Sequence, residues 1–146
     1  MLVLTSDVKL IVWDLDDTLW QGTLMNHDAL LLREEFVDYI KETAKRGVVH
    51  SLCSKNDFEP TKAYICSLGL WDLFVFPSIN WEEKGARVQK IMEQLQVDPT
   101  ETIFIDDNAS NLEDALRCCD GLRTFFPEEF LEWIHKENSD VNQAAQ

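Results

Sequence analysis

The chain has 146 residues, and its 45% hydrophobic content with eight phenylalanines and five tryptophans indicates one folded domain and excludes global disorder. With 27 acidic and 13 basic residues, its formal net charge is −14, which argues against nucleic acid or an anionic membrane as a partner, because either needs a basic face. No apolar run reaches the roughly 18 residues of a membrane span, and the first ten residues lack a signal-peptide pattern. We therefore expect a cytoplasmic protein whose four cysteines are reduced.

Short apolar runs alternate with amphipathic patterns along the whole chain. In chain order, the apolar runs predict strands at residues 9–14, 48–54, 73–76, 102–107 and 122–126. The amphipathic patterns between and after them predict helices at residues 33–47, 57–69, 83–97, 109–119 and 127–137. This alternation is typical of an α/β, three-layer Rossmann-like fold, with a five-stranded parallel sheet and helices on both faces. Residues 1–138 are expected to form the domain and 139–146 a disordered tail.

Two acidic clusters follow two of the predicted strands. Asp14, Asp16 and Asp17 come after the first strand, and Asp106 and Asp107 after the fourth. A single aspartate at such a place is usually a helix cap or turn former. Two clusters at equivalent strand ends favour a shared site instead, because the carboxyl ends of parallel strands meet at one edge. Carboxylate oxygens suit a hard divalent cation, so we expect an Mg²⁺ site.

Four sequence motifs now stand in order along the chain. They are DLDDT at residues 14–18, Ser54 within CSKND, Lys84 within NWEEKG, and FIDD at residues 104–107. Together they resemble the four motifs of the haloacid dehalogenase (HAD) superfamily of phosphohydrolases, of which DxDxT is the first. The longer strings around them are similar to subfamily IIIC, which includes small magnesium-dependent phosphatases and the FkbH-like proteins. The resemblance spans most of the chain and implies a HAD-like fold.

The resemblance also implies a role for each acidic residue. Asp14 would be the nucleophile that forms an aspartyl-phosphate, a step in which a bridging Mg²⁺ offsets the repulsion between carboxylate and phosphate. Asp16 would protonate the leaving oxygen and then activate the hydrolytic water. Thr18 would orient this loop through its hydroxyl. The expected metal-binding residues are Asp14, Asp16, Asp106 and Asp107, and the sequence leaves open which of the last two is a direct ligand.

A second group of residues is expected to bind the phosphoryl group. By resemblance, Ser54 and the amides after it hold the phosphoryl oxygens, and Lys84 neutralises the remaining charge. The alternative for Ser54 is an ordinary cap. The alternative for Lys84 is a solvated lysine like Lys90 on the same helix. Lys55 and Asn56 are candidate substrate contacts, and a solvated loop explains them equally well.

The segment between Thr18 and the first helix, residues 19–32, is long enough for a flap but not for a cap domain. Between Ser54 and Lys84 there is room for one helix and one strand only. The resemblance therefore implies a capless domain with an open site. Asp17 occupies the variable position of the DxDxT signature and is expected to shape the turn.

Two aromatic residues and one thiol near these motifs need separate interpretations. Trp20 and Trp81 are candidate walls of the site, and simple core packing is favoured for both. Cys53 is a candidate acyl acceptor by analogy with carrier-loading relatives. A buried, inert thiol is favoured, because Cys53 and Ser54 alternate across a strand covered on both faces.

The motifs favour a Mg²⁺-dependent phosphohydrolase that acts on a phosphorylated small molecule, either a metabolite or an acyl phosphate. The alternative is FkbH-like loading of a phosphoglycerate-derived glyceryl unit onto an acyl carrier protein. A receiver-like signalling module is disfavoured, because there the acidic pair precedes the phospho-accepting Asp and the Lys comes last. The sequence names neither the substrate nor the oligomeric state, and an oligomer is compatible with it.

Overall fold

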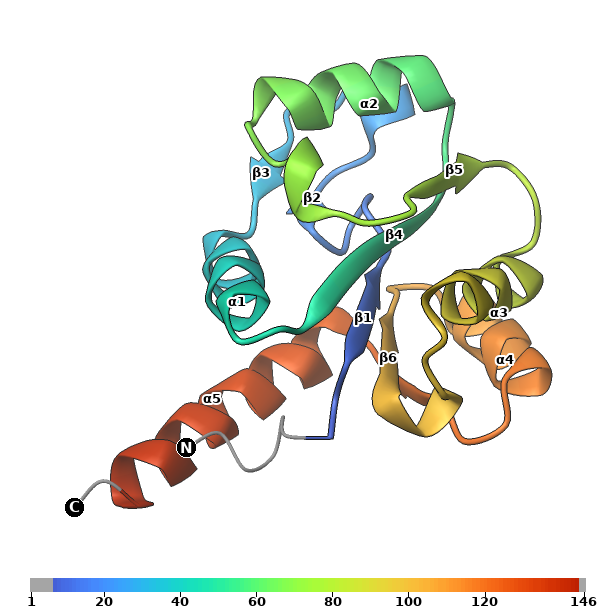
Figure 1. The fold of residues 1–146 in the computed structure, drawn as a ribbon. Coiled ribbons are helices and arrows are strands. Elements are labelled where there is room, and N and C mark those ends of the chain that lie inside the picture. The colour runs from blue at the N-terminus through green and yellow to red at the C-terminus, as the bar shows by residue number, and fades with distance from the viewer. Residues whose placement is uncertain (1–6, 145–146) are drawn as a thin grey trace.

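The computed structural model describes residues 7–144 and has the expected three-layer α/β architecture (Figure 1). Its parallel sheet has the strand order β5-β4-β1-β6-β7, with bounds β1 Leu10–Trp13, β4 Val49–Lys55, β5 Ser78–Asn80, β6 Thr102–Ile105 and β7 Arg123–Phe125. The helices are α1 Glu34–Lys45, α2 Phe58–Ser67, α3 Lys84–Leu95, α4 Ala109–Cys118 and α5 Pro127–Ala144. Within residues 7–144, no helix has both the length and the apolar character needed to cross a membrane.

The two faces of the sheet bury two separate cores because successive side chains of a strand point to opposite sides. On β1, Ile11 and Trp13 pack with buried residues of α1, α2 and α5. Leu10 and Val12 pack with buried residues of α3 and α4 on the other side. Trp13 lies 5.2 Å from the Phe36 ring, between centroids, and both rings are fully buried. This double burial explains why β1 is a continuous apolar run.

The central position of β1 sets the place of the site. Trp13 at its end pairs with Leu52 of β4 on one side and with Ile105 of β6 on the other. The residues that follow these strand ends therefore meet at one edge of the sheet, where the chain order reverses between neighbouring strands. Asp14 and Asp106 come directly after β1 and β6 at this edge.

The predicted flap is a small antiparallel ribbon between β1 and α1. Its strands are β2 Trp20–Gln21 and β3 Leu31–Leu32, with the 3₁₀ helix η2 Leu24–Asn26 between them. Asp17, which has a φ of 56°, accepts a hydrogen bond from the Gly22 amide at 2.8 Å. This contact gives Asp17 the turn-shaping position expected for it. Between residues 7 and 144 no larger domain is inserted at either cap position.

The prediction of a third strand at residues 73–76 is wrong. The chain forms the 3₁₀ helix η3 Trp71–Leu73 there, and Phe74 contributes only an isolated bridge to β4. Phe76 has a φ of 50°, which breaks an extended strand, and regular pairing begins only after Pro77, in β5. This apolar run is also partly exposed rather than buried, with Phe76 46% accessible.

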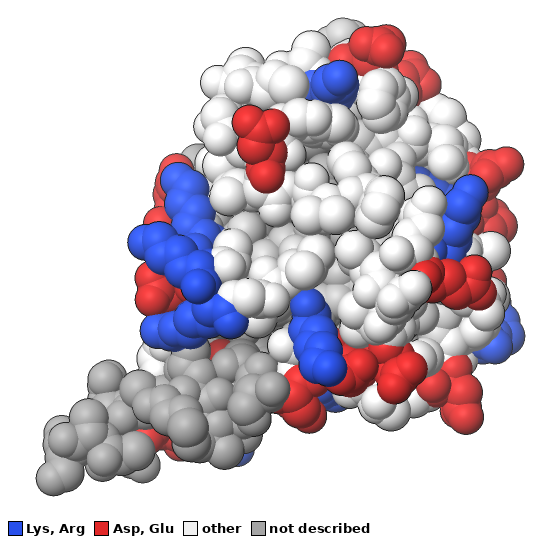
Figure 2. Space-filling model, in the orientation of Figure 1, with Lys and Arg blue, Asp and Glu red and all other residues white. Residues whose placement is uncertain are grey.

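The segment between η3 and β5 crosses the face drawn in Figures 1 and 2. Figure 2 shows that the middle of this face carries mainly uncharged side chains, with Lys, Arg, Asp and Glu interspersed around its margin.

The expectation of a disordered tail at residues 139–146 also differs from the structure over most of that range. Helix α5 continues through Ala144, whereas residues 145–146, like residues 1–6, lie outside the described part of the chain. No proline or glycine follows Pro127, so nothing in the sequence ends the helix at residue 138. Each additional residue also forms a further backbone hydrogen bond within the helix.

Candidate active site

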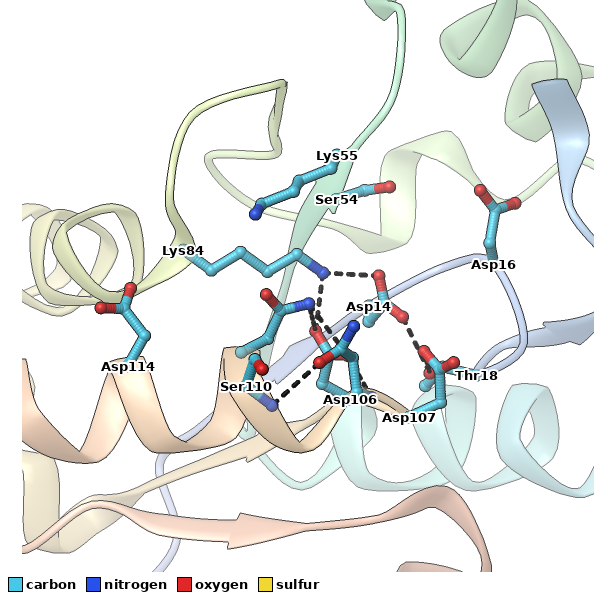
Figure 3. Close-up of polar contacts among 12 residues, drawn as sticks. Asp14, Asp16, Thr18, Ser54, Lys55, Lys84, Asp106, Asp107, Ser110 and Asp114 are labelled. Atoms are coloured by element: carbon cyan, nitrogen blue, oxygen red, sulfur yellow. Dashed lines mark hydrogen bonds and ion pairs between the residues drawn. The ribbon is translucent and has the colours of Figure 1, made fainter.

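A buried lysine joins two strand ends at the carboxyl edge of the sheet (Figure 3). Lys84 Nζ lies 2.7 Å from Asp14 Oδ1 and 2.6 Å from Asp106 Oδ2. Lys84 is the first residue of α3 and is 2% exposed, so it is not a solvated surface lysine, whereas Lys90 is exposed. Burial alone would lower the pKa of Lys84, but the two carboxylates outweigh it and raise the pKa. Lys84 is therefore held as a cation.

The Lys84 ammonium group lies beside a group of three carboxylates, those of Asp14, Asp106 and Asp107. Burial raises the pKa of Asp14 to about 7, and the neighbouring Asp107 adds to that rise, while Lys84 opposes it. Burial and Asp14 likewise raise the pKa of Asp106. Thr18 Oγ1 lies 3.0 Å from Asp14 Oδ2 and 3.4 Å from Asp107 Oδ1, but its single hydrogen can serve only one of them. The site therefore has an excess of negative charge that a cation would stabilise.

The same carboxylates form a group with the chemistry of a metal site. Asp14, Asp106 and Asp107 each offer an oxygen, and these oxygens all lie within 4.8 Å of one another. Asp106 also accepts hydrogen bonds from the Asn108 amide at 2.9 Å and from Asn111 Nδ2 at 3.3 Å, which fix its orientation. An all-oxygen donor set fits Mg²⁺. The structure thus brings together three of the four predicted metal residues.

The fourth, Asp16, has its carboxylate outside this group of oxygens. Its Oδ1 accepts hydrogen bonds from Trp20 Nε1 at 3.0 Å and from the Leu24 amide at 2.9 Å. Its Oδ2 accepts one from Asn56 Nδ2 at 2.9 Å. Figure 3 shows the Asp16 side chain apart from Asp14, and these three donors hold it there. The group of converging carboxylates in the described residues therefore does not include Asp16.

The predicted phosphoryl-binding residues take three different positions. Ser54 is buried at the end of β4, and its Oγ accepts a hydrogen bond from Asn56 Nδ2 at 2.9 Å. Asn56 is itself buried, so it is not part of a solvated loop. Lys55 is partly exposed and lies 3.4 Å from Glu83, with which it joins the loops after β4 and β5.

The two aromatic predictions have opposite outcomes. Trp20 is fully buried, in agreement with core packing. Trp81 is 57% exposed, so the packing prediction is wrong for it, and its Nε1 donates to Asp57 Oδ1 at 2.8 Å. The reason is its place in the loop after the edge strand β5, where a polar partner holds the indole at the surface.

The expected burial of Cys53 is confirmed. Its side chain is fully buried in the core formed with α3 and α4. Burial raises the pKa of this thiol to about 11, so the reactive thiolate is disfavoured.

Two residues that sequence reasoning missed fix the beginning of α3. Arg87 donates to the carbonyl oxygens of Ser54 and Ser78 at 2.7 Å, which ties α3 to the end of β4 and the beginning of β5. Asp114 of α4 accepts a hydrogen bond from the Gly85 amide at 2.7 Å. A Cβ at Gly85 would lie 2.7 Å from the Asp114 carbonyl oxygen, so this position requires glycine. No sequence motif marked Arg87 or Asp114, because their partners are distant backbone groups.

Comparison with known proteins shows which solved structures have a similar fold. Protein-family models and curated proteins give no match. Among solved structures, the phosphatase-containing N-terminal part of BF1531 from Bacteroides fragilis, complexed with Mg, aligns with a TM-score of 0.80 and 22% identity. That alignment covers 92% of this chain but only 41% of the neighbour, so this chain spans less than half of its length.

Two further solved structures have a similar fold. The cobalt-bound deoxy-D-mannose-octulosonate 8-phosphate phosphatase YrbI from Haemophilus influenzae aligns with a TM-score of 0.67 and 22% identity, over 84% of this chain and 70% of the neighbour. A HAD-superfamily hydrolase from Ehrlichia chaffeensis aligns with a TM-score of 0.69 and 11% identity, over 92% and 98%. At these identities the likeness concerns the fold. The chain has the fold of the HAD-superfamily phosphatases, without a cap domain between residues 7 and 144.

Proposed function

We propose that this chain is a Mg²⁺-dependent phosphohydrolase that works through an aspartyl-phosphate on Asp14. The observation that carries the proposal is the buried Lys84 bound to both Asp14 and Asp106, with Asp107 as a third carboxylate beside them. The motif resemblance supports the assignment, as do the Mg-complexed phosphatase domain and the octulosonate phosphatase among the structural neighbours.

Asp14, Asp106 and Asp107 would hold the Mg²⁺ ion, since their oxygens converge and carry more negative charge than Lys84 neutralises. The bound ion would lower the repulsion between the Asp14 carboxylate and a phosphate dianion. Lys84 and Thr18 hold the two oxygens of Asp14 in place for attack. Lys84, which has three N–H donors, retains one for a phosphoryl oxygen.

Two chemical steps follow from this arrangement. In the first, an Asp14 oxygen bonds to phosphorus as the bond to the leaving oxygen breaks, and Asp16 gives that oxygen a proton. In the second, Asp16 takes a proton from the water that attacks phosphorus, and the bond between phosphorus and Asp14 breaks. The Ser54 hydroxyl, located near the end of the buried strand β4, would donate to a phosphoryl oxygen.

The absence of a cap between residues 7 and 144 leaves the carboxyl edge open apart from the flap. We infer a phosphorylated small molecule as substrate. The resemblance to subfamily IIIC adds acyl phosphates to the candidate substrates. That subfamily also suggests transfer of a glyceryl unit to an acyl carrier protein. The buried Cys53 offers no accessible thiol for such a transfer, so hydrolysis is the better-supported reaction.

The experiment is a phosphate-release screen over sugar phosphates, phosphorylated acids and acyl phosphates, with Mg²⁺ or with EDTA. We expect Mg²⁺-dependent release by the wild type and loss of at least about 10³-fold in Asp14→Asn. Asp17→Asn is the matched control, because asparagine tolerates the positive φ and still accepts the Gly22 hydrogen bond. Release that survives in Asp14→Asn would contradict the proposal. Added acyl carrier protein, analysed by mass, should remain unloaded.

A further inference from the structure

Asn56 occupies a position that neither substrate binding nor a solvated loop explains. It is 1% exposed, and its Nδ2 lies 2.9 Å from both Asp16 Oδ2 and Ser54 Oγ. The NH₂ group of the amide carries two N–H donors, and one is directed at each of these two oxygens. Both N–H bonds are then used within the protein, and Asn56 has no donor left for a substrate.

The Asp16 carboxylate is held from two sides. The flap supplies Trp20 Nε1 and the Leu24 amide, and both bind Oδ1. The loop after β4 supplies Asn56, which binds Oδ2. Each carboxylate oxygen has two lone pairs, so Oδ1 with its two donors is filled, whereas Oδ2 with one donor retains an open site.

The same amide group also orients Ser54. Because Ser54 Oγ accepts a hydrogen bond from Asn56, its own hydrogen is free to donate elsewhere. A single NH₂ group therefore fixes a residue proposed to bind phosphoryl oxygen and the residue proposed to transfer the proton.

We propose that Asn56 is a positioning residue that holds the Asp16 carboxylate with Oδ2 on the Ser54 side of the site, so that Oδ2 is the oxygen that exchanges protons with the leaving group and the water. This inference rests on the proposed phosphatase function and adds a role for a residue that does not touch the reacting atoms. Trp20 Nε1 and the Leu24 amide hold the same carboxylate from the other side through their hydrogen bonds to Oδ1.

The proposal predicts a selective defect, because proton transfer matters most for poor leaving groups. Phenyl phosphate and 4-nitrophenyl phosphate have nearly the same shape, but nitrophenolate departs without a proton whereas phenoxide gains from one. In Asn56→Ala, the first-turnover rate measured by rapid quench should fall roughly 10- to 100-fold for phenyl phosphate and less than about threefold for 4-nitrophenyl phosphate. The dissociation constant of the enzyme–ester complex, obtained from the concentration dependence of the first-turnover rate, should be nearly unchanged for both esters.

The second step gives an independent readout. Since Asp16 also activates the water, Asn56→Ala should release nitrophenol in a burst, followed by slower turnover. Asn56→Asp keeps the shape of the side chain but replaces the donor with an acceptor, so it should show the same selective defect. Asn138→Ala, an exposed position on α5, is the matched control and should behave as the wild type.

Several outcomes would overturn the proposal. A similar loss on both esters would indicate general disruption of the site, and a raised KM with unchanged kcat would indicate a substrate contact. Trp20→Phe removes one Oδ1 donor and should give the same selectivity with a smaller loss, which keeps the test available if Asn56→Ala does not fold. Wild-type protein that releases no phosphate from these esters or from the screened compounds would overturn the phosphatase function itself, and this inference with it.

Discussion

Replacement of Lys84 with methionine should destabilise the protein strongly and in a pH-dependent way. The substitution keeps an unbranched side chain of similar length but removes the ammonium group from two buried carboxylates. Lys84 Nζ lies 2.7 Å from Asp14 Oδ1 and 2.6 Å from Asp106 Oδ2, and all three side chains are at most 8% exposed. No other cation lies within salt-bridge distance of these two carboxylates among the described residues.

Removal of one partner from a buried ion pair typically lowers the free energy of unfolding by about 3–5 kcal/mol, because the remaining charge has no compensation. At pH 8 without Mg²⁺, we expect a loss in this range. For a chain of this size, it corresponds to a fall in melting temperature of roughly 10–15 °C.

The loss should be smaller at pH 5. Burial already raises the pKa of Asp14 to about 7 and raises that of Asp106, and loss of Lys84 removes the cation that opposes these rises. A carboxyl group whose pKa is raised in the folded state favours folding at low pH, and this contribution is lost as the pH rises through the folded-state value. The deficit of Lys84→Met should therefore grow between pH 5 and pH 8.

Thermal unfolding followed by circular dichroism, in EDTA at both pH values, measures this effect. Lys90→Met on the exposed side of α3 is the matched control and should change the melting temperature by only a degree or two. If Lys84→Met were as stable as Lys90→Met at pH 8, the view that Lys84 neutralises the two carboxylates would be refuted.

Three further predictions concern the metal group, a buried glutamate and the beginning of α3. Mg²⁺ at about 100 times its Kd should stabilise the wild type by about 2.7 kcal/mol, or roughly 10 °C in a thermal scan. Asp107→Asn should reduce this shift, and an equal shift in the variant would exclude Asp107 from the metal site. Glu137 is buried beside Tyr39, and burial raises its pKa to about 7, so its contribution to stability is lost as the pH rises from about 4.5 to 7. In urea unfolding, Glu137→Gln should therefore be up to about 3 kcal/mol more stable than the wild type at pH 8 but not at pH 4.5. Equal stability of the two proteins at pH 8 would contradict this prediction. Gly85→Ala should lower the first-turnover rate on 4-nitrophenyl phosphate, because the added Cβ would lie 2.7 Å from the backbone of α4 and displace Lys84; an unchanged rate in a folded variant would show that this close approach is not needed.

The sequence predicts the layers of the fold well because burial on both faces leaves a direct pattern. Strand β1 is apolar at every position since its alternate side chains enter two cores. The error at residues 73–76 has a different origin. That run is as apolar as a strand, but the left-handed backbone at Phe76 and the following proline move the pairing to Ser78–Asn80. Such a local backbone choice depends on tertiary contacts and not on hydrophobicity.

In the candidate site, too, some positions follow from the topology and others depend on tertiary contacts. Asp14, Asp106 and Lys84 come together because they lie at strand and helix ends, whose places follow from the topology. The environment of Asp16 depends instead on how the flap folds back, since two of its three donors belong to residues 20 and 24.

The role of Asn56, like the environment of Asp16, depends on tertiary contacts. Its amide acquires a function only through contacts with Ser54 and Asp16, and the second of these lies 40 positions away in the chain. A sequence motif marks a residue but does not show which group its side chain will bind.

The proposed mechanism requires that Asp14 carry a phosphoryl group during turnover. The direct measurement is mass spectrometry of peptides from protein that is acid-quenched within the first turnover, in the presence of Mg²⁺ and the best substrate of the screen. We expect a phosphoryl adduct on Asp14, absent from Asp14→Asn and more abundant in Asn56→Ala, where hydrolysis is slowed. Steady phosphate release with no adduct on Asp14 in the wild type or in Asn56→Ala would contradict it.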